Sequence, residues 1–198
     1  EVTPGKAPLV YKLVDDFYSS FEFPEGSSLT LNAIQNKSEW TNATHFLNFA
    51  GSADALAQLR DLRSGDEYDT YVNNLQGLAK IVAMKQGQSL VRIPGENGTY
   101  SEQMWSFFVE NPGVFAEAFV ELNKGFSNGN YISLGMYTGG ERNETHYIYT
   151  THSDAKNQFT FFPDNEKEQK AFAKFQSSVS PISQFKGSII STVLGTWN

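Results

Sequence analysis

The sequence NATHFL at residues 42–47 recurs as NETHYI at residues 143–148. The two copies are 101 positions apart, measured from His45 to His146, and the alignment continues without a gap to about residue 93 of the first copy. Identical residues are few, but the apolar segments follow the same order in both halves. Because an internal repeat constrains the whole fold, we predict two tandem repeats.

The predicted repeats cover residues 1–96 and 97–198, and the second has the clearer pattern. Its first helix has Asn111 as a capping residue and Pro112 at the first helical position, and Gly125 ends it. The predicted elements of this repeat are a strand over 103–110, that helix, strands over 131–138 and 145–151, a helix capped by Asp164 or Asn165 and ended by Pro181, and a strand over 186–194.

The first repeat has a weak or absent first strand. Only residues 1–6 remain for it, and Pro4 and Gly5 are poor strand residues. The rest keeps the same order with one addition. The predicted elements are a helix over 8–21, strands over 29–35 and 44–49, an added helical stretch with Leu56, Leu59 and Leu62, a main helix after the break at residues 64–66, and a strand over 89–93.

The order β-α-β-β-α-β is the ferredoxin-like unit. Two helices cover one face of its sheet, so the other face needs a partner. In this order the chain resembles the dimeric α+β barrel superfamily, with both protomers on one chain. The resemblance implies an α+β fold in which two ferredoxin-like repeats pack as a pseudo-two-fold barrel. Two such domains side by side, without a cavity, are the alternative.

The resemblance leaves the activity open, because one fold supports many functions. Members of the superfamily include cofactor-free monooxygenases, haem-dependent enzymes, isomerases of small molecules and proteins with no known activity. They bind ligands between a sheet and its helices or inside the barrel. The phosphate loop, the dinucleotide-binding glycine motif and the nucleophile elbow are all missing from the sequence.

The composition of the chain limits the kinds of partner that it can bind. A net charge of −7 with scattered Lys and Arg argues against nucleic acid and anionic membranes, which need a basic face. No stretch approaches the roughly 20 apolar residues that cross a bilayer, so we expect no membrane insertion. The chain has no cysteine, which excludes disulfides and thiolate metal sites.

The first eight residues, EVTPGKAP, are typical of the extended segment that follows a removed signal peptide, although a trimmed chain would look the same. We therefore expect a secreted or periplasmic protein. Four Asn-x-Ser/Thr motifs are candidate glycosylation sites, at Asn36, Asn42, Asn97 and Asn143. With this many Asn, Ser and Thr, about two or three motifs arise by chance, so the four do not establish a glycoprotein.

Two of the three histidines, His45 and His146, hold equivalent positions in the repeat and are the candidate catalytic residues. The alternative is that each fixes a local turn. A metal site from His146, His152 and Asp154 is disfavoured, because six residues of strand span roughly 20 Å whereas zinc ligands lie about 2 Å from the ion. Nothing selects a histidine as a haem ligand, so we expect neither a metal nor a cofactor.

Aromatic side chains make up 14% of the chain, which favours a bulky core or a ligand cavity. Five of them combine an apolar ring with a polar tip and are candidate ligand-binding residues, although a packed core also explains them: Trp40, Trp105, Tyr137, Tyr147 and Tyr149.

Three functions fit these observations. The first is an exported, non-catalytic domain that binds a small apolar or aromatic molecule or a protein partner. That partner can be a second copy of the same chain. The second is a cofactor-independent enzyme of the monooxygenase or isomerase kind, with a repeat histidine as the base. The third is an extracellular structural or surface-assembly component.

Overall fold

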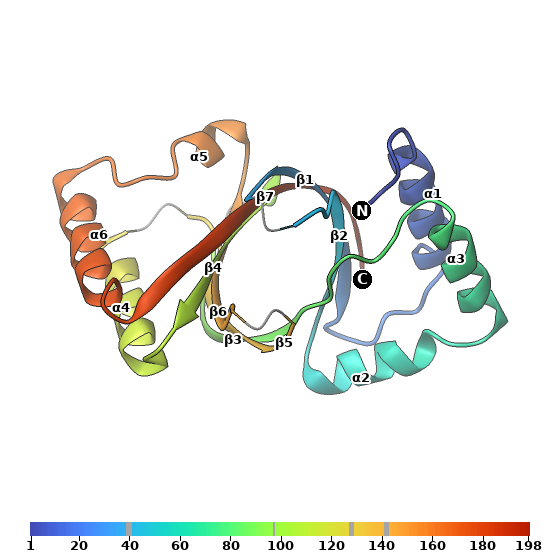
Figure 1. Cartoon of the computed structure of the whole chain (residues 1–198), viewed down its shortest axis with the longest axis horizontal. Coiled ribbons are helices and arrows are strands. Elements are labelled where there is room, and N and C mark those ends of the chain that lie inside the picture. Colours follow the sequence, from blue (N-terminus) through green and yellow to red (C-terminus); the bar gives the residue numbers. More distant parts are fainter. Residues whose placement is uncertain (39–40, 97, 127–128, 141–142) are drawn as a thin grey trace. The chain divides into compact units, whose positions relative to one another are not determined.

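The computed structural model describes residues 1–38, 41–96, 98–126, 129–140 and 143–198 (Figure 1). Over these residues the fold is mixed α+β, with six helices and seven strands. In chain order the elements are α1 (Ala7–Tyr18), β1 (Ser28–Lys37), β2 (His45–Ala50), α2 (Ala53–Leu62), α3 (Asp66–Gln76), β3 (Gln86–Ile93), β4 (Ser101–Val109), α4 (Pro112–Gly125), β5 (Ile132–Gly139), β6 (His146–His152), α5 (Ala155–Phe159), α6 (Glu166–Val179) and β7 (Ser183–Trp197).

The chain divides into two compact units. The first consists of Glu1–Gln35, Thr41–Val82 and Thr192–Asn198, and the second of Asn36–Trp40 and Ala83–Ser191. Strand β7 therefore contributes its last residues to the first unit and its earlier residues to the second.

Neither unit is a continuous segment of the sequence. Strand β3 falls within the predicted repeat 1–96, yet it pairs with β5 and belongs to the second unit. The compact units are defined by contacts in space, whereas the repeats are defined by similarity of sequence, so the two divisions need not coincide. The division into repeats 1–96 and 97–198 therefore stays a prediction.

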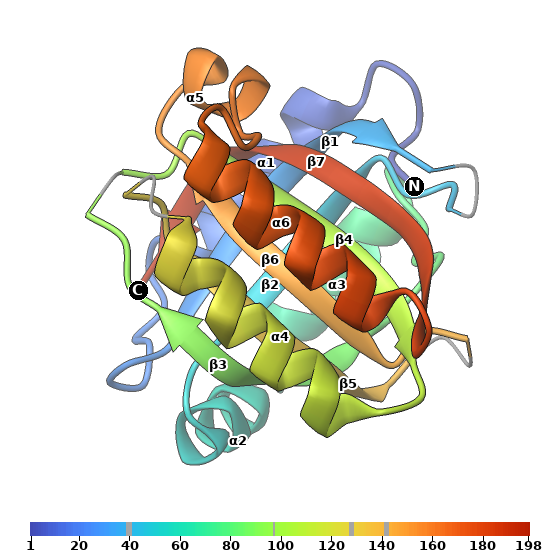
Figure 2. The ribbon, with the colours of Figure 1, turned by 90° about the vertical axis from the view of Figure 1, so that its left-hand side faces the viewer.

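The second unit has a sheet in the order β7-β4-β6-β5-β3, in which β4, β6, β5 and β3 pair antiparallel. Figure 2 shows α4 and α6 side by side across one face of this sheet. Helix α4 buries Phe115, Ala118 and Phe119, which share one helix face at i, i+3 and i+4. These side chains pack on Leu134 and Ile148 of the strands and form the core of the unit.

Both long helices of the second unit begin as predicted. The Asn111 side chain accepts a hydrogen bond from the Val114 N–H at 3.2 Å, and the Asn165 side chain accepts one from the Glu168 N–H at 3.0 Å. Helix α5 was not predicted. It has only five residues, and its start is capped by Asp154, which accepts from the Asn157 N–H at 2.7 Å.

The first unit has the strand order β2-β1-β7, with β1 and β2 antiparallel. Helices α1 and α3 lie side by side in this unit (Figure 1), and Phe17 stacks on Tyr71 with ring centroids 4.7 Å apart. Its core contains Val10, Val14 and Tyr18 from α1, Leu29 and Leu31 from β1, Tyr71 from α3 and Trp197 from β7.

The first residues of the chain pair with residues 78–80 but form no continuous strand. Val2 forms an isolated antiparallel bridge with Ala79, and the Thr3 N–H donates to the Leu78 carbonyl at 2.9 Å. A turn at Pro4 and Gly5, where the backbone is left-handed at φ 78°, ends the pairing before α1. Among the described helices, none is long and apolar enough to cross a membrane.

Candidate functional site

The first repeat histidine lies at the start of β2, beside a threonine that joins three parts of the first unit. The Thr44 hydroxyl oxygen accepts a hydrogen bond from the Val2 N–H at 2.9 Å and lies 3.1 Å from His45 Nδ1. The Thr44 carbonyl accepts from the Ile34 N–H at 2.9 Å. His45 thus takes part in fixing the start of its strand.

The second repeat histidine has the same local contacts in the second unit. The Thr145 hydroxyl accepts from the Val109 N–H at 2.8 Å and lies 2.9 Å from His146 Nδ1. The Thr145 carbonyl accepts from the Tyr137 N–H at 2.9 Å. These are the contacts expected if each histidine fixes a local turn, and they leave the catalytic role of both histidines untested.

Burial keeps both repeat histidines neutral. It lowers the pKa of His146, which is 4% exposed and lies 6.2 Å from the Phe115 ring, between centroids. Burial also lowers the pKa of His45. His146 Nε2 is buried without a hydrogen-bond partner, so the helix-covered face holds a neutral imidazole against an apolar core.

The predicted ligand-binding aromatics do not form one site. Trp105 packs with the core under α4 and α6 and stacks on Phe161, with centroids 5.9 Å apart. Tyr137, Tyr147 and Tyr149 alternate with core residues of β5 and β6, so they lie on the opposite face of the sheet. Trp40, predicted with them, lies outside the described residues.

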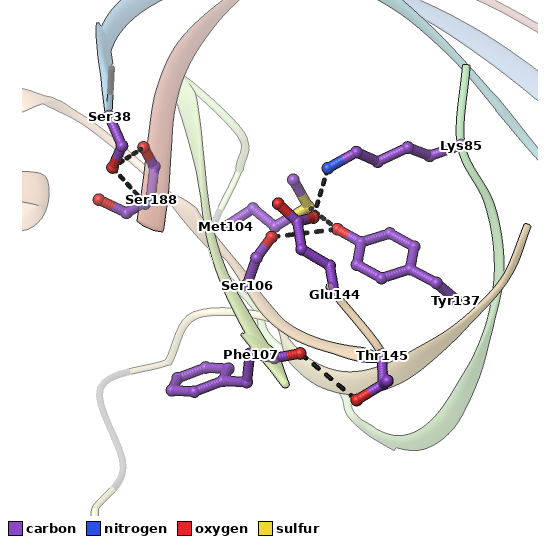
Figure 3. A network of polar contacts seen from close by, with 9 residues as sticks. All are labelled: Ser38, Lys85, Met104, Ser106, Phe107, Tyr137, Glu144, Thr145 and Ser188. Atoms are coloured by element: carbon purple, nitrogen blue, oxygen red, sulfur yellow. Dashed lines mark hydrogen bonds and ion pairs between the residues drawn. The ribbon is translucent and has the colours of Figure 1, made fainter. Parts of the chain in front are cut away.

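The face of this sheet without helices carries a network of polar contacts (Figure 3). The Tyr137 hydroxyl donates to Met104 Sδ at 3.4 Å and lies 3.3 Å from Ser106 Oγ. Lys85 forms an ion pair with Glu144, and its Nζ lies 5.2 Å from the centre of the Tyr137 ring. Burial raises the pKa of Tyr137, with the Ser106 hydrogen bond opposing that change and the Glu144 charge adding to it. Tyr137 therefore remains a phenol.

Tyr147 lies flat across its neighbouring strand. A Cβ on Gly135 would come within 2.1 Å of the Tyr147 ring carbon Cζ, and one on Gly87 within 3.1 Å of Cε1. The Tyr147 hydroxyl reaches Ser89 of β3, whose hydrogen bond opposes the rise in the pKa of Tyr147 that burial causes. The glycines thus make room for one ring across three strands.

A buried carboxyl group lies on the same face, at the start of β4. Glu102 is 6% exposed, and the Tyr149 hydroxyl hydrogen-bonds to it. Burial raises the pKa of Glu102, and the Tyr149 contact opposes this only in part. Glu102 Oε2 and the hydroxyl of Thr151, the residue directly opposite on β6, are both buried without a hydrogen-bond partner. Glu102 was not predicted as a site residue from the sequence, although an acidic residue within an otherwise apolar strand is the pattern that would have indicated it.

The helix-covered face has a polar group of its own at the end of β6. His152 is fully buried, its Nε2 lies 3.2 Å from Gln103 Oε1, and its ring packs edge-on against Phe161 with centroids 5.0 Å apart. Nearby, the Ser101 hydroxyl donates to Gln158 Oε1 at 2.7 Å. The sequence singled out His152 only as a metal ligand. In the part of the chain that the structure describes, no three acidic or histidine side chains gather as a metal site.

Three of the four glycosylation motifs lie at the surface. Asn36, Asn42 and Asn143 are exposed, whereas Asn97 lies outside the described residues. Use of these motifs stays a prediction.

Comparison with known proteins gives the fold. No family model and no curated protein matches the chain. A monooxygenase-like protein of Fusobacterium nucleatum is 12% identical, with a TM-score of 0.60 over 100% of this chain and 90% of its own. One from Lactobacillus acidophilus is 8% identical, with a TM-score of 0.57 over 100% and 91%. An anthrone oxidase-like protein is 13% identical, with a TM-score of 0.56 over 98% and 88%. These likenesses support the predicted resemblance to α+β barrel proteins at the level of the fold.

Proposed function

We propose that the chain binds a small aromatic molecule beside His152 and removes a proton from it without a cofactor, as an oxygenase or isomerase does. The observation that carries this proposal is a neutral, fully buried imidazole with one nitrogen unpaired, set among aromatic rings. The proposal moves the base from the predicted His45 and His146 to the third histidine.

The hydrogen bond to Gln103 decides which nitrogen of His152 can act as the base. Gln103 Oε1 is an acceptor, so the imidazole Nε2 opposite it carries the proton. Nδ1 then holds the lone pair, and it has no hydrogen-bond partner. Burial lowers the pKa of His152, and a hydrogen bond with the Asn157 side chain opposes this in part. The imidazole is therefore neutral at neutral pH, the form that can act as a general base.

Aromatic side chains around His152 suit a flat, apolar substrate. Phe161 contacts the imidazole and also Trp105 and Phe126, with ring centroids 5.0, 5.9 and 5.6 Å apart. Phe159 and Phe162, on the same segment, are 75% and 71% exposed. In the proposed site these two exposed rings flank the entrance.

The names of the structural neighbours favour oxidation over isomerisation. Two are monooxygenase-like and one is anthrone oxidase-like. In the proposed reaction His152 takes a proton from an acidic CH₂ group of the substrate. The carbanion adds O₂ to form a peroxide anion, which takes the proton back and loses water to leave a carbonyl. One CH₂ and one O₂ thus give one C=O and one H₂O.

The test uses anthrone as the probe, with hydrogen–deuterium exchange at its CH₂ group and oxygen uptake as two separate readouts. We expect the wild-type chain to accelerate exchange and His152→Gln to lower that rate by about 100-fold or more. His146→Gln, a buried histidine on the same strand, is the matched control and keeps the rate. The wild-type rate falls as acid protonates His152, below the usual histidine range because its pKa is lowered. Equal rates for wild type and His152→Gln overturn the proposal.

Exchange and oxygen uptake also separate the alternatives. Exchange without uptake assigns isomerisation, and saturable binding of anthrone without exchange supports the non-catalytic binding domain. If anthrone does not bind, the proposal of an aromatic ligand of this kind fails, and the structural-component hypothesis is favoured.

We also propose that the chain arose by fusion of two copies of one ferredoxin-like unit. The support is that Thr44 and Thr145 make the same three contacts, each with a backbone N–H at its hydroxyl, a second N–H at its carbonyl, and the following histidine.

A further inference from the structure

Two buried oxygens without partners lie opposite each other on the helix-free face of the second unit. They are Glu102 Oε2 and Thr151 Oγ1, on residues that are 6% and 5% exposed. Because Glu102 and Thr151 are directly paired in the β4–β6 register, their Cβ atoms are about 5 Å apart. Buried polar atoms are nearly always satisfied, and each that is not costs about 1–3 kcal/mol. This pair of unpaired atoms therefore points to a group that hydrogen-bonds with both oxygens.

The surroundings favour a positively charged donor. None of the ion pairs among the described residues includes Glu102. Its hydrogen bond from the Tyr149 hydroxyl leaves the second carboxyl oxygen open. The Tyr131 ring packs against Tyr149 at 5.9 Å between centroids, and aromatic faces attract cations. Tyr149 thus contacts both the Glu102 carboxyl group and the Tyr131 ring.

We propose that this site binds the primary ammonium group of a small organic amine. The ammonium donates one hydrogen bond to Glu102 Oε2 and one to Thr151 Oγ1, and its charge compensates the carboxylate. A neutral alcohol lacks that charge. Calcium and magnesium need about six oxygen ligands, and two side-chain oxygens do not supply them.

The site is separate from the one beside His152. Tyr100, two residues before Glu102 at the start of β4, is exposed. Thr151 and His152 are consecutive on β6 and lie on opposite faces of the sheet. Amine binding therefore does not depend on the proposed proton transfer.

The experiment titrates the wild-type chain at pH 7.5 with methylammonium, butylammonium and phenethylammonium chloride, and with 1-butanol as the uncharged control. Binding is followed by calorimetry and by the amide NMR shift of Thr151. We expect saturable binding of at least one amine and none of butanol. Glu102→Gln keeps the shape of the side chain but removes its charge and replaces one acceptor oxygen with an NH₂ donor, and we expect affinity at least tenfold weaker. We expect Glu110→Gln, at an exposed residue just after the same strand, to bind as wild type does.

Each outcome decides the proposal. Failure of all three amines to bind overturns it, as does equal affinity for amine and butanol, or an unchanged affinity in Glu102→Gln. Thr151→Val is a second variant, in which we expect about threefold weaker binding, so the idea remains testable if Glu102→Gln does not fold. We also measure the anthrone reaction in the presence of saturating amine. An unchanged rate shows that amine binding and the function proposed for His152 are independent of each other.

Discussion

The two faces of the sheet in the second unit are built from the same strands and have opposite chemistry. Under α4 and α6 the side chains are Phe115, Phe119, Leu134 and Ile148. On the other face the strands present Glu102, Ser106, Tyr137, Tyr147 and Tyr149. Alternation along each strand separates the two sets. The comparison teaches that the helix-covered face contributes mainly apolar packing, whereas the other face contributes mainly polar contacts, and each contains buried polar atoms without a partner.

The largest expected effect comes from opening the helix-covered core. Phe119 is fully buried, so Phe119→Ala removes its apolar contacts and leaves a cavity. We expect a loss of about 3–5 kcal/mol in the free energy of unfolding, measured by urea denaturation. Val120→Ala, at the next residue of the same helix but 37% exposed, is the control and costs well under half as much. Equal losses contradict the assignment of stability to this face.

A smaller effect is expected on the polar face, where the packing is specific at Gly135. A Cβ at this position would lie 2.1 Å from the Tyr147 ring, so Gly135→Ala forces the ring away from its contact with Ser89. We expect a loss of about 1–3 kcal/mol, as for other overpacked sites. Gly139→Ala on the same strand is the control, because the nearest atom there is 3.9 Å away. A Tyr147 fluorescence or NMR signal that does not change in Gly135→Ala would contradict the geometry.

Much of the fold was predictable because its signals are local. Asn111 and Pro112 marked the start of α4, and alternating β-branched and aromatic residues marked β5 and β6. Helix α5 was missed because five residues carry no helical period. The pairing of β3 with β5 was also not predictable, since the choice of strand partner depends on contacts between distant segments.

The candidate sites were less predictable than the fold. The repeat drew attention to His45 and His146, yet repetition marks structural residues as readily as functional ones. His152 and Glu102 have no counterpart in a motif, and their interest comes from burial and unpaired atoms. The grouping of Trp105 with Tyr137 ignored the parity of the strands, which places them on opposite faces.

The smallest expected effect has the opposite sign and comes from Glu102. Burial raises the pKa of Glu102 in the folded chain above the ordinary 4.5 of the unfolded one. The folded state therefore binds the carboxyl proton of Glu102 more tightly than the unfolded state does. Protonated Glu102 contributes its full stabilisation of the folded state below pH 4.5, and this contribution is lost as the pH rises through the raised pKa. Glu102→Gln carries no charge at any pH, and its amide oxygen still accepts from Tyr149. We therefore expect the free energy of unfolding of Glu102→Gln to rise relative to that of wild type as the pH increases. The difference should be smaller than the loss caused by Gly135→Ala, and urea denaturation at pH 4, 5.5, 7 and 8.5 measures it. A difference that stays constant across this range would mean that the carboxyl group is solvated, and the contrast between the two faces would then rest on packing alone.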